Sequence, residues 1–161
     1  MAGSHFKLPY IMANNSKVIK STDYRWESVS RKEYKDTPGC YEGVSRYALL
    51  GEGEDELNFQ TRYFEVKEGG YTSFERHRHP HSVIIIRGSG SVIIGDEVHE
   101  IGLHDVVFIS PNTMHQFQAD KDEPLGFICI VDRYRDKPEL PDDEQVENEI
   151  TDKKVLEKIK R

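Results

Sequence analysis

The side chains best suited to chemistry in this sequence are histidines. The chain contains seven, and six of them fall between His77 and His115. Neutral imidazole is the commonest metal ligand among protein side chains, and it titrates near neutral pH. Imidazole suits iron, zinc, copper and nickel alike. The crowding therefore predicts a site for a divalent transition metal without choosing the metal.

The densest part of this crowd is the segment His77-Arg78-His79-Pro80-His81. Side chains alternate along a strand, so we expect His77 and His79 on one face, about 7 Å apart along the backbone. In a straight strand His81 lies about 13 Å from His77, near the limit for one metal to bind both. Pro80 cannot continue a central ladder. We therefore expect the chain to bend there and His81 to begin the next strand.

The elements that must position these histidines are predicted to be short β-strands. Glycine-rich and Asp/Pro-containing breakers separate apolar runs, and no helical period of comparable strength falls between them. Such spacing without intervening helices predicts an all-β sandwich or barrel. The expected strands are Val44–Leu50, Leu57–Lys67, Tyr71–His79, Ser82–Arg87, Ser91–Ile94, Val98–Ile101, Asp105–Ile109, His115–Ala119 and Leu125–Val131.

Local patterns refine this prediction. Gly95-Asp96 predicts a tight hairpin, and Gly69-Gly70 predicts a break between two strands. The runs Val83–Ile86 and Phe127–Val131 are apolar at every position, so we expect central strands covered on both faces. Three aromatic side chains are expected in the wall and core: Phe74, Phe108 and Phe117.

The chain divides into three expected parts. Residues 1–40 form an N-terminal extension, in which Tyr24–Val29 is suited to add an edge strand to a neighbouring subunit. Residues 41–134 form the barrel. Residues 135–161 form an acidic tail in which one weak amphipathic helix is expected, either packed on the barrel or a partner subunit or left in solvent. Gly3-Ser4-His5 is open to two interpretations, a cloning remnant ahead of a natural start at Met12 or native sequence, so His5 is set aside.

Composition limits the class of protein. With 161 residues and a formal net charge of −7, the chain has the size of one domain, and its acidity argues against nucleic acid as the main partner. No apolar run approaches the roughly 20 residues of a membrane span. The start lacks a basic segment followed by an apolar one, so we expect no membrane association and a cytoplasmic location. Two cysteines are too few for a disulfide scaffold.

Two motifs resemble those of the cupin superfamily. Gly70, His77-Arg78-His79 and the run to Gly88-Ser89-Gly90 resemble the first motif. The second motif is similar to the pattern formed by Gly102, Asp105, Pro111 and His115. The resemblance covers roughly residues 64–131 and implies a small jelly-roll β-barrel with its metal ligands inside. It also implies homodimers paired through sheet edges, and it specifies no substrate.

Carried over residue by residue, the resemblance implies His77, His79 and His115 as metal ligands. The remaining ligand of the first motif is usually a glutamate seven residues before a glycine, and His81 stands seven before Gly88. Counting from Gly90 instead reaches Val83, which cannot bind a metal, so we prefer His81. Glu75 shares strand parity with His77 and is the other candidate for the fourth ligand. His104 replaces a turn residue of the motif, and both it and His99 are expected at the surface.

The resemblance implies a divalent metal (Fe, Mn, Zn, Ni or Cu) and a small-molecule ligand. Four neutral imidazoles leave the charge of the ion uncompensated, which favours an anionic or chelating oxygen ligand. We expect a metal-dependent enzyme acting on a small organic acid or oxygenated metabolite, with dioxygenase-like chemistry slightly favoured. The alternatives are lyase or isomerase chemistry, a non-catalytic sensor or small-ligand carrier, and a structural barrel whose histidines are vestigial. Glu75 is the candidate general base, or merely a charged residue at the barrel mouth. Arg87 is the candidate for holding a substrate carboxylate, or merely an ion-paired strand end.

Overall fold

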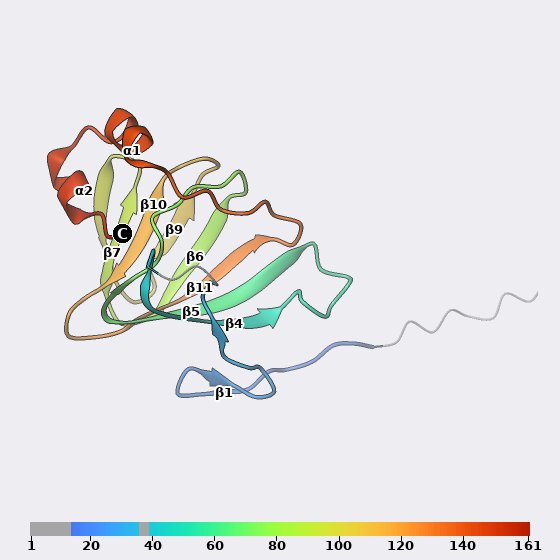
Figure 1. Ribbon diagram of the computed structural model, residues 1–161. Helices are drawn as coiled ribbons and strands as arrows, with labels where there is room; N and C mark the ends of the chain where they lie inside the picture. Colours follow the sequence, from blue (N-terminus) through green and yellow to red (C-terminus); the bar gives the residue numbers. More distant parts are fainter. Residues whose placement is uncertain (1–13, 36–38) are drawn as a thin grey trace, which may run out of the picture.

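The computed structural model describes residues 14–35 and 39–161 (Figure 1). Gly3-Ser4-His5 and Met12 lie outside the described residues. Within them the chain is all-β apart from two short C-terminal helices, as expected. The strands are β1 (Ser21–Thr22), β2 (Arg25–Trp26), β3 (Lys32–Glu33), β4 (Glu42–Leu50), β5 (Phe59–Tyr71), β6 (His81–Arg87), β7 (Gly90–Ile94), β8 (Glu97–Ile101), β9 (Val106–Ile109), β10 (His115–Ala119) and β11 (Leu125–Asp132).

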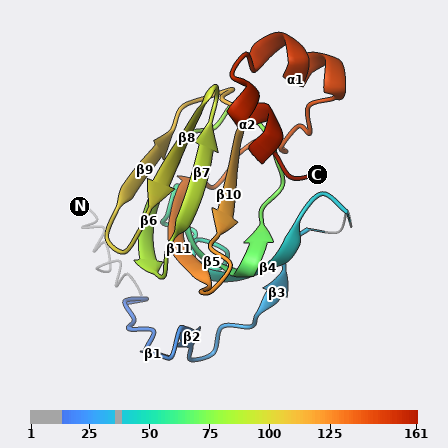
Figure 2. The same ribbon diagram turned by 90° about the vertical axis from the view of Figure 1, so that its left-hand side faces the viewer.

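One curled antiparallel sheet contains β3 to β11. Its main path runs β8-β7-β10-β5-β11-β6-β9, with β4 also pairing β5 and β3 pairing β4. The long strand β5 contacts three others, β4, β10 and β11, and so joins the two halves of the sheet (Figures 1 and 2). Curling turns one face of each strand inward, where the main apolar core lies. The predicted all-β jelly-roll class is confirmed.

Burial along β6 shows that only one of its faces is covered. Val83 and Ile85 are fully buried, whereas Ile84 between them is 36% exposed. The expectation that the Val83–Ile86 run is covered on both faces is therefore wrong. Phe108, expected in the core, is 65% exposed on β9, whose register places it opposite Ser82 on the outer face. Phe74 and Phe117 are buried as expected.

The predicted break at Gly69-Gly70 is also wrong, because β5 continues through both glycines to Tyr71. A side chain on Gly70 would place Cβ 2.5 Å from the carbonyl oxygen of Glu42, so the glycine permits close strand contact rather than a turn. The strand expected over Tyr71–His79 is absent; residues 72–80 form an irregular segment with isolated bridges at Glu75 and Arg76. The other expected strands are observed, and Gly95-Asp96 forms the predicted hairpin between β7 and β8.

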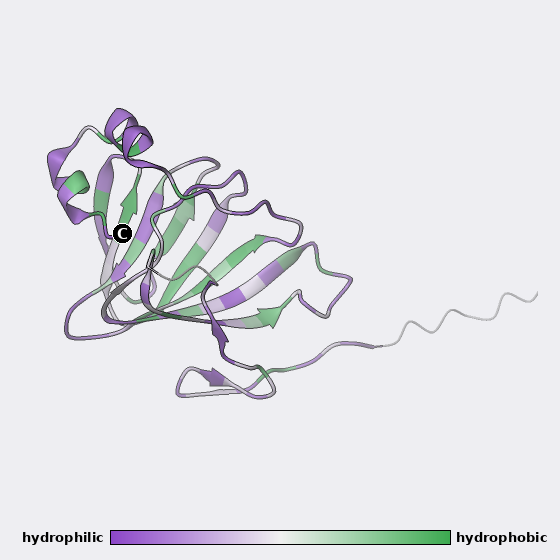
Figure 3. Cartoon of the chain, viewed as in Figure 1, coloured by the Kyte–Doolittle hydropathy of each residue, from purple (hydrophilic) through white to green (hydrophobic). Residues whose placement is uncertain are grey.

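The C-terminal tail packs on the barrel and forms two helices, α1 (Asp143–Glu149) and α2 (Lys153–Lys158), where one was expected. Asp142 caps α1 through a capping box with Gln145. Figure 3 shows helices that are mostly hydrophilic, and Figure 2 places them beside β7 and β10. Their few apolar side chains join a second core: Phe74, Ile93, Met114, Val146, Ile150 and Val155. Gln116 on β10 also donates to the carbonyl oxygen of Lys160 at 2.8 Å.

At the other end of the described chain, β1 and β2 form a small hairpin. It packs against the barrel through aromatic rings, with Trp26 lying 4.6 Å from Tyr63 between ring centroids. The edge-strand role expected for Tyr24–Val29 in a neighbouring subunit stays a prediction, as do the boundaries at residues 40 and 134. Neither of the helices in the described part of the chain is long and apolar enough to cross a membrane.

Candidate metal centre

Four histidines converge inside the barrel and are called the histidine cluster below: His77, His79, His81 and His115. Ring nitrogens of His77, His81 and His115 all lie within 4.8 Å of one another. The fourth member, His79, stacks on His77 with ring centroids 3.7 Å apart. Its Nε2 lies 3.2 Å from Nε2 of His81. Three histidines are thus placed for metal binding, with His79 in contact with two of them, His77 and His81.

Different elements bring these side chains together. His81 begins β6, as expected from the bend at Pro80, and His115 begins β10. His77 and His79 lie in the irregular segment, so strand alternation does not place them. The carboxylate of Asp136 organises this bend instead, accepting hydrogen bonds from the backbone N–H groups of Arg78 at 2.8 Å and His79 at 3.1 Å.

Hydrogen bonds at Nδ1 orient three of the rings. Nδ1 of His77 donates to the carbonyl oxygen of His79 at 2.7 Å, and Nδ1 of His115 donates to that of Thr113 at 2.9 Å. Nδ1 of His79 lies 2.8 Å from Oδ1 of Asp136, the carboxylate–histidine pairing typical of metal sites. In neutral rings these donors leave the Nε2 lone pairs free to bind a cation.

The donor set fits a metal. Nε2 of His77 is buried and has no hydrogen-bond partner, a costly state that a bound cation would relieve. With metal–nitrogen bonds of about 2.1 Å, ligands at right angles lie about 3 Å apart, close to the 3.2 Å between His79 and His81. Burial and the neighbouring histidines His115 and His79 lower the pKa of His77 to about 4. Burial also lowers the pKa of His81 and of His115. The rings are therefore neutral at neutral pH, as metal ligands must be.

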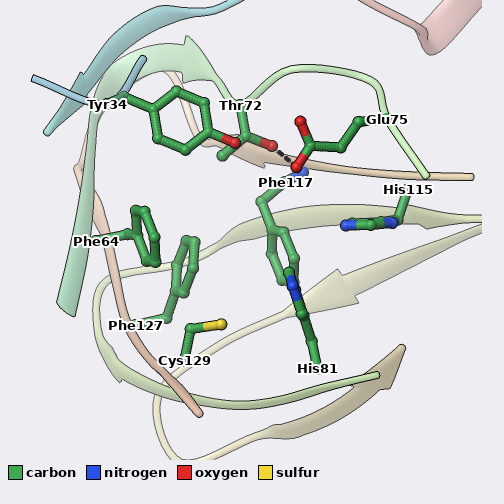
Figure 4. Close-up of a pocket in the computed structure, with 9 residues that line it drawn as sticks. All are labelled: Tyr34, Phe64, Thr72, Glu75, His81, His115, Phe117, Phe127 and Cys129. Atoms are coloured by element: carbon green, nitrogen blue, oxygen red, sulfur yellow. Dashed lines mark hydrogen bonds between the residues drawn. The ribbon is translucent and has the colours of Figure 1, made fainter. Parts of the chain in front are cut away.

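Glu75 lies directly across the backbone from His115, with reciprocal N–H···O bonds of 3.1 and 2.9 Å. Directly opposed residues project their side chains to the same face. The buried carboxylate of Glu75 accepts hydrogen bonds from Ser73 and Lys35. With His81, His115, Phe64 and Phe127 it lines a narrow cavity of about 30 Å³. Figure 4 shows these side chains around the cavity. The structure thus brings Glu75 beside the three histidines that are placed for metal binding but does not include it in their group.

The remaining sequence candidates lie elsewhere. Arg87 forms an ion pair with Glu65 at 2.5 Å and lies over the ring of Tyr24, and it lines neither cavity that reaches the histidine cluster. His99 and His104 are exposed, as expected. His104 adopts a positive φ of 75° in its turn.

Sequence reasoning missed a basic group beside the histidines. A second cavity, of about 180 Å³, is lined by Tyr34, Lys35, Arg46, Arg62, Phe64, Glu75, His77, His79, His81, Arg135 and Pro138. The sequence does contain a signal for one member of this basic group. Arg62 lies two residues before Phe64 and four before Val66, so strand alternation places its side chain on the same inward face as theirs. Asp136 carried no such signal, because it lies in the tail.

Comparison with known proteins agrees with this architecture. Residues 62–131 match the cupin domain family. A protein of Rhodospirillum rubrum named 1-methylthio-D-xylulose 5-phosphate methylsulfurylase is 41% identical over 122 residues, covering 74% of this chain and 76% of that protein.

Solved structures are similar over most of the chain. A cupin 2 conserved barrel domain protein from Rhodopseudomonas palustris has a TM-score of 0.83 at 37% identity, covering 91% of this chain and all of that one. A cupin 2 domain-containing protein from Halorhodospira halophila has a TM-score of 0.72 at 38% identity, covering 90% of this chain and 96% of that one.

Proposed function

The chain belongs to the cupin superfamily, and from that premise we propose that it is a metal-dependent enzyme acting on a phosphorylated ketose. The substrate we favour carries a sulfur substituent beside its carbonyl group. The observation that carries the proposal is the 41% identity to a protein named for 1-methylthio-D-xylulose 5-phosphate. That identity extends over a chain in which Glu75 and His81 line both cavities beside the histidine cluster, the smaller together with His115 and the larger together with His77 and His79.

The proposed chemistry is proton transfer at a carbon next to the ketone, without oxygen as a reactant. The histidine cluster would hold a divalent metal, which when bound supplies Lewis-acid polarisation of a carbonyl oxygen. Glu75 would accept the proton from the adjacent carbon, and the electron pair of the broken C–H bond would pass toward the carbonyl oxygen. Lys35, ion-paired with Glu75, keeps that carboxylate in place.

The surroundings of Glu75 support this role. Phe64, Phe117 and Phe127 line the same cavity and limit the access of water. The Glu75 residue is 5% exposed, so a carboxylate is kept in the barrel interior at a cost that a purely structural position would not require. We prefer this chemistry to the expected dioxygenase-like chemistry because the relative from Rhodospirillum rubrum is named for a sugar phosphate and a methylsulfur group, and its name mentions no oxygen.

Hydrogen exchange provides the test. The protein is incubated in D₂O with 1-methylthio-D-xylulose 5-phosphate, and loss of the proton signals next to the carbonyl is followed by NMR. We expect exchange with the wild type and a reduction of about 100-fold or more in Glu75→Gln, the usual range for a lost general base. Glu68→Gln, an exposed change on β5, is the matched control and should exchange normally.

Two results would contradict the proposal. One is equal exchange by wild type and Glu75→Gln. The other is absence of exchange together with oxygen consumption by the iron-loaded protein and a candidate acid, which would establish the dioxygenase alternative.

A further inference from the structure

The larger cavity beside the histidine cluster is lined by more positive than negative side chains. Four of its lining residues are cationic, Lys35, Arg46, Arg62 and Arg135, and one, Glu75, is anionic. The chain as a whole has a formal net charge of −7. The lining of this cavity is therefore positive in a chain that is negative overall. Because His77, His79 and His81 line the same cavity, a small molecule bound beside them would also contact these cations.

Three of these cations form no ion pair within residues 14–35 and 39–161. Lys35 is ion-paired with Glu75, but no described carboxylate forms an ion pair with Arg46, Arg62 or Arg135, called the arginine cluster below. Elsewhere on the barrel, by contrast, Arg87 and Arg133 pair with Glu65 and Asp55.

Two members of the arginine cluster also have buried donors without acceptors. Nε of Arg46 and Nε of Arg62 are both buried and make no hydrogen bond in the described part of the chain. The whole Arg62 residue is only 8% exposed; its Nη2 donates to Sγ of Cys129 at 3.3 Å, and its guanidinium lies 5.0 Å from the ring centroid of Phe64. Buried N–H groups without partners are rare and costly. Because both residues line the cavity, these N–H groups are available to donate to an acceptor that binds there.

Strand register explains why the arginines lie together. Arg46 pairs with Phe64 and Ala48 pairs with Arg62, so the two arginines are diagonal neighbours on one face of β4 and β5. Arg62 is opposite Cys129 on β11, and Arg135 follows that strand. Burial and the positive charges of Arg62 and Arg46 lower the pKa of Arg135.

Neutral and acidic groups near Arg135 do not cancel this charge. Nη1 of Arg135 donates to the amide oxygen of Gln60 at 2.7 Å. Glu52 raises the pKa of Arg135, but this effect is smaller than those of burial and the neighbouring arginines. The Glu52 carboxylate is ion-paired with Lys32 at 2.6 Å.

We infer that Arg46, Arg62 and Arg135 form a binding site for the phosphate group of the substrate. A phosphate monoester is a dianion at neutral pH with three terminal oxygens, so it can accept from several guanidinium forks, whereas one carboxylate has two oxygens and one charge. The arginines account only for the phosphate; that the phosphate belongs to a ketose rests on the proposed function. With the phosphate at the arginine cluster, the carbonyl end lies toward Glu75 and three of the histidines, because all of them line the same cavity: His77, His79 and His81.

Calorimetric titration of the full chain tests this assignment with three probes: inorganic phosphate, D-xylulose 5-phosphate and D-xylulose. Each titration is run on protein as purified and after treatment with a chelator, which separates phosphate bound by arginines from phosphate bound by a metal. We expect wild type to bind the phosphorylated sugar at least about tenfold more tightly than the sugar, with or without chelator. The variant Arg46→Gln/Arg135→Gln should lose about tenfold or more of its affinity for inorganic phosphate.

Arg133→Gln is the matched control, because Arg133 lies two residues from Arg135 but pairs with Asp55 outside the cavity. It should bind phosphate as wild type does. Equal affinity of wild type for the phosphorylated and free sugars would overturn the inference without any variant. Unchanged phosphate affinity in a folded Arg46→Gln/Arg135→Gln protein would also overturn it.

Failure of this inference is distinguishable from failure of the proposed function. Arginine-dependent phosphate binding without hydrogen exchange would leave the anion site standing and remove the proposed reaction. Hydrogen exchange with an unchanged KM in the double arginine variant would leave the reaction standing and remove the anion site.

Discussion

Oδ1 of Asp136 lies 2.8 Å from Nδ1 of His79, although 57 residues separate the two in the chain. The same carboxylate accepts hydrogen bonds from the backbone N–H groups of Arg78 and His79. The bond from the Arg78 backbone and the bond to the His79 side chain hold the pKa of Asp136 well below its usual range. The segment after the barrel therefore shapes the bend that carries two of the four histidines.

Removing this carboxylate should weaken metal binding. In Asp136→Asn the charge opposite Nδ1 of His79 is lost, and the loss of such a partner typically costs 10- to 100-fold in metal affinity, so we expect about that decrease. Competition with a chromophoric chelator measures the affinity. Asp122→Asn, an exposed change in the loop before β11, is the control and should bind as wild type does. Equal affinities of the two variants would show that Asp136 has no influence on the metal.

Metal content should depend on the inner histidines and not on the outer ones. His77→Ala/His115→Ala removes two of the three grouped ligands, so elemental analysis of protein purified without added metal should find the metal nearly absent. His99→Ala/His104→Ala changes two exposed histidines and should retain wild-type content. Full metal content in the first variant would rule out this site. The same analysis identifies the metal.

Acid should destabilise the chelator-treated protein before its carboxylates titrate. His77 has a pKa of about 4 when folded and about 6.5 when unfolded. Between these values the unfolded chain binds more protons, so the free energy of unfolding falls as pH decreases from about 6.5 to about 4. Urea denaturation across this range should show the decline, and His77→Gln should show a smaller one. A constant stability over this interval would contradict the lowered pKa.

The C-terminal helices should contribute to stability. Ile150 is 2% exposed in the second core, and truncating a buried isoleucine to alanine costs about 2–5 kcal/mol. Urea denaturation of Ile150→Ala should show a loss in this range. Leu103→Ala, at a residue that is 55% exposed, should change stability by no more than about 0.5 kcal/mol. Similar small changes in both variants would show that the tail is dispensable for folding.

The homodimer expected from the family resemblance stays a prediction. β9 is an edge strand of the sheet and exposes Val106 and Phe108. Size-exclusion chromatography with light scattering should give twice the mass of one chain. A monomer whose mass does not change with concentration would refute the dimer.

Sequence patterns predicted most strands because breakers and apolar runs act over a few residues. The same reasoning failed where a long-range contact decided the outcome. A strand was expected over Tyr71–His79, but in this segment Asp136 and Asn112 supply hydrogen-bond partners that a strand would have found in its neighbour. The outer face of β6 was expected to be buried, yet Ile84 on that face is 36% exposed, because a run of apolar residues does not show which face of a strand the fold leaves open to solvent.

The sequence by itself determined the all-β class, the bend at Pro80 and the histidines suited to bind metal, because strand periodicity, proline geometry and imidazole chemistry are local properties. Only the tertiary structure decided that Asp136 orients His79 and that Arg46, Arg62 and Arg135 line the cavity beside the histidines. Those relationships depend on strand register and on the return of the tail to the barrel. Both are set by packing between residues far apart in the chain, which no short stretch of sequence encodes.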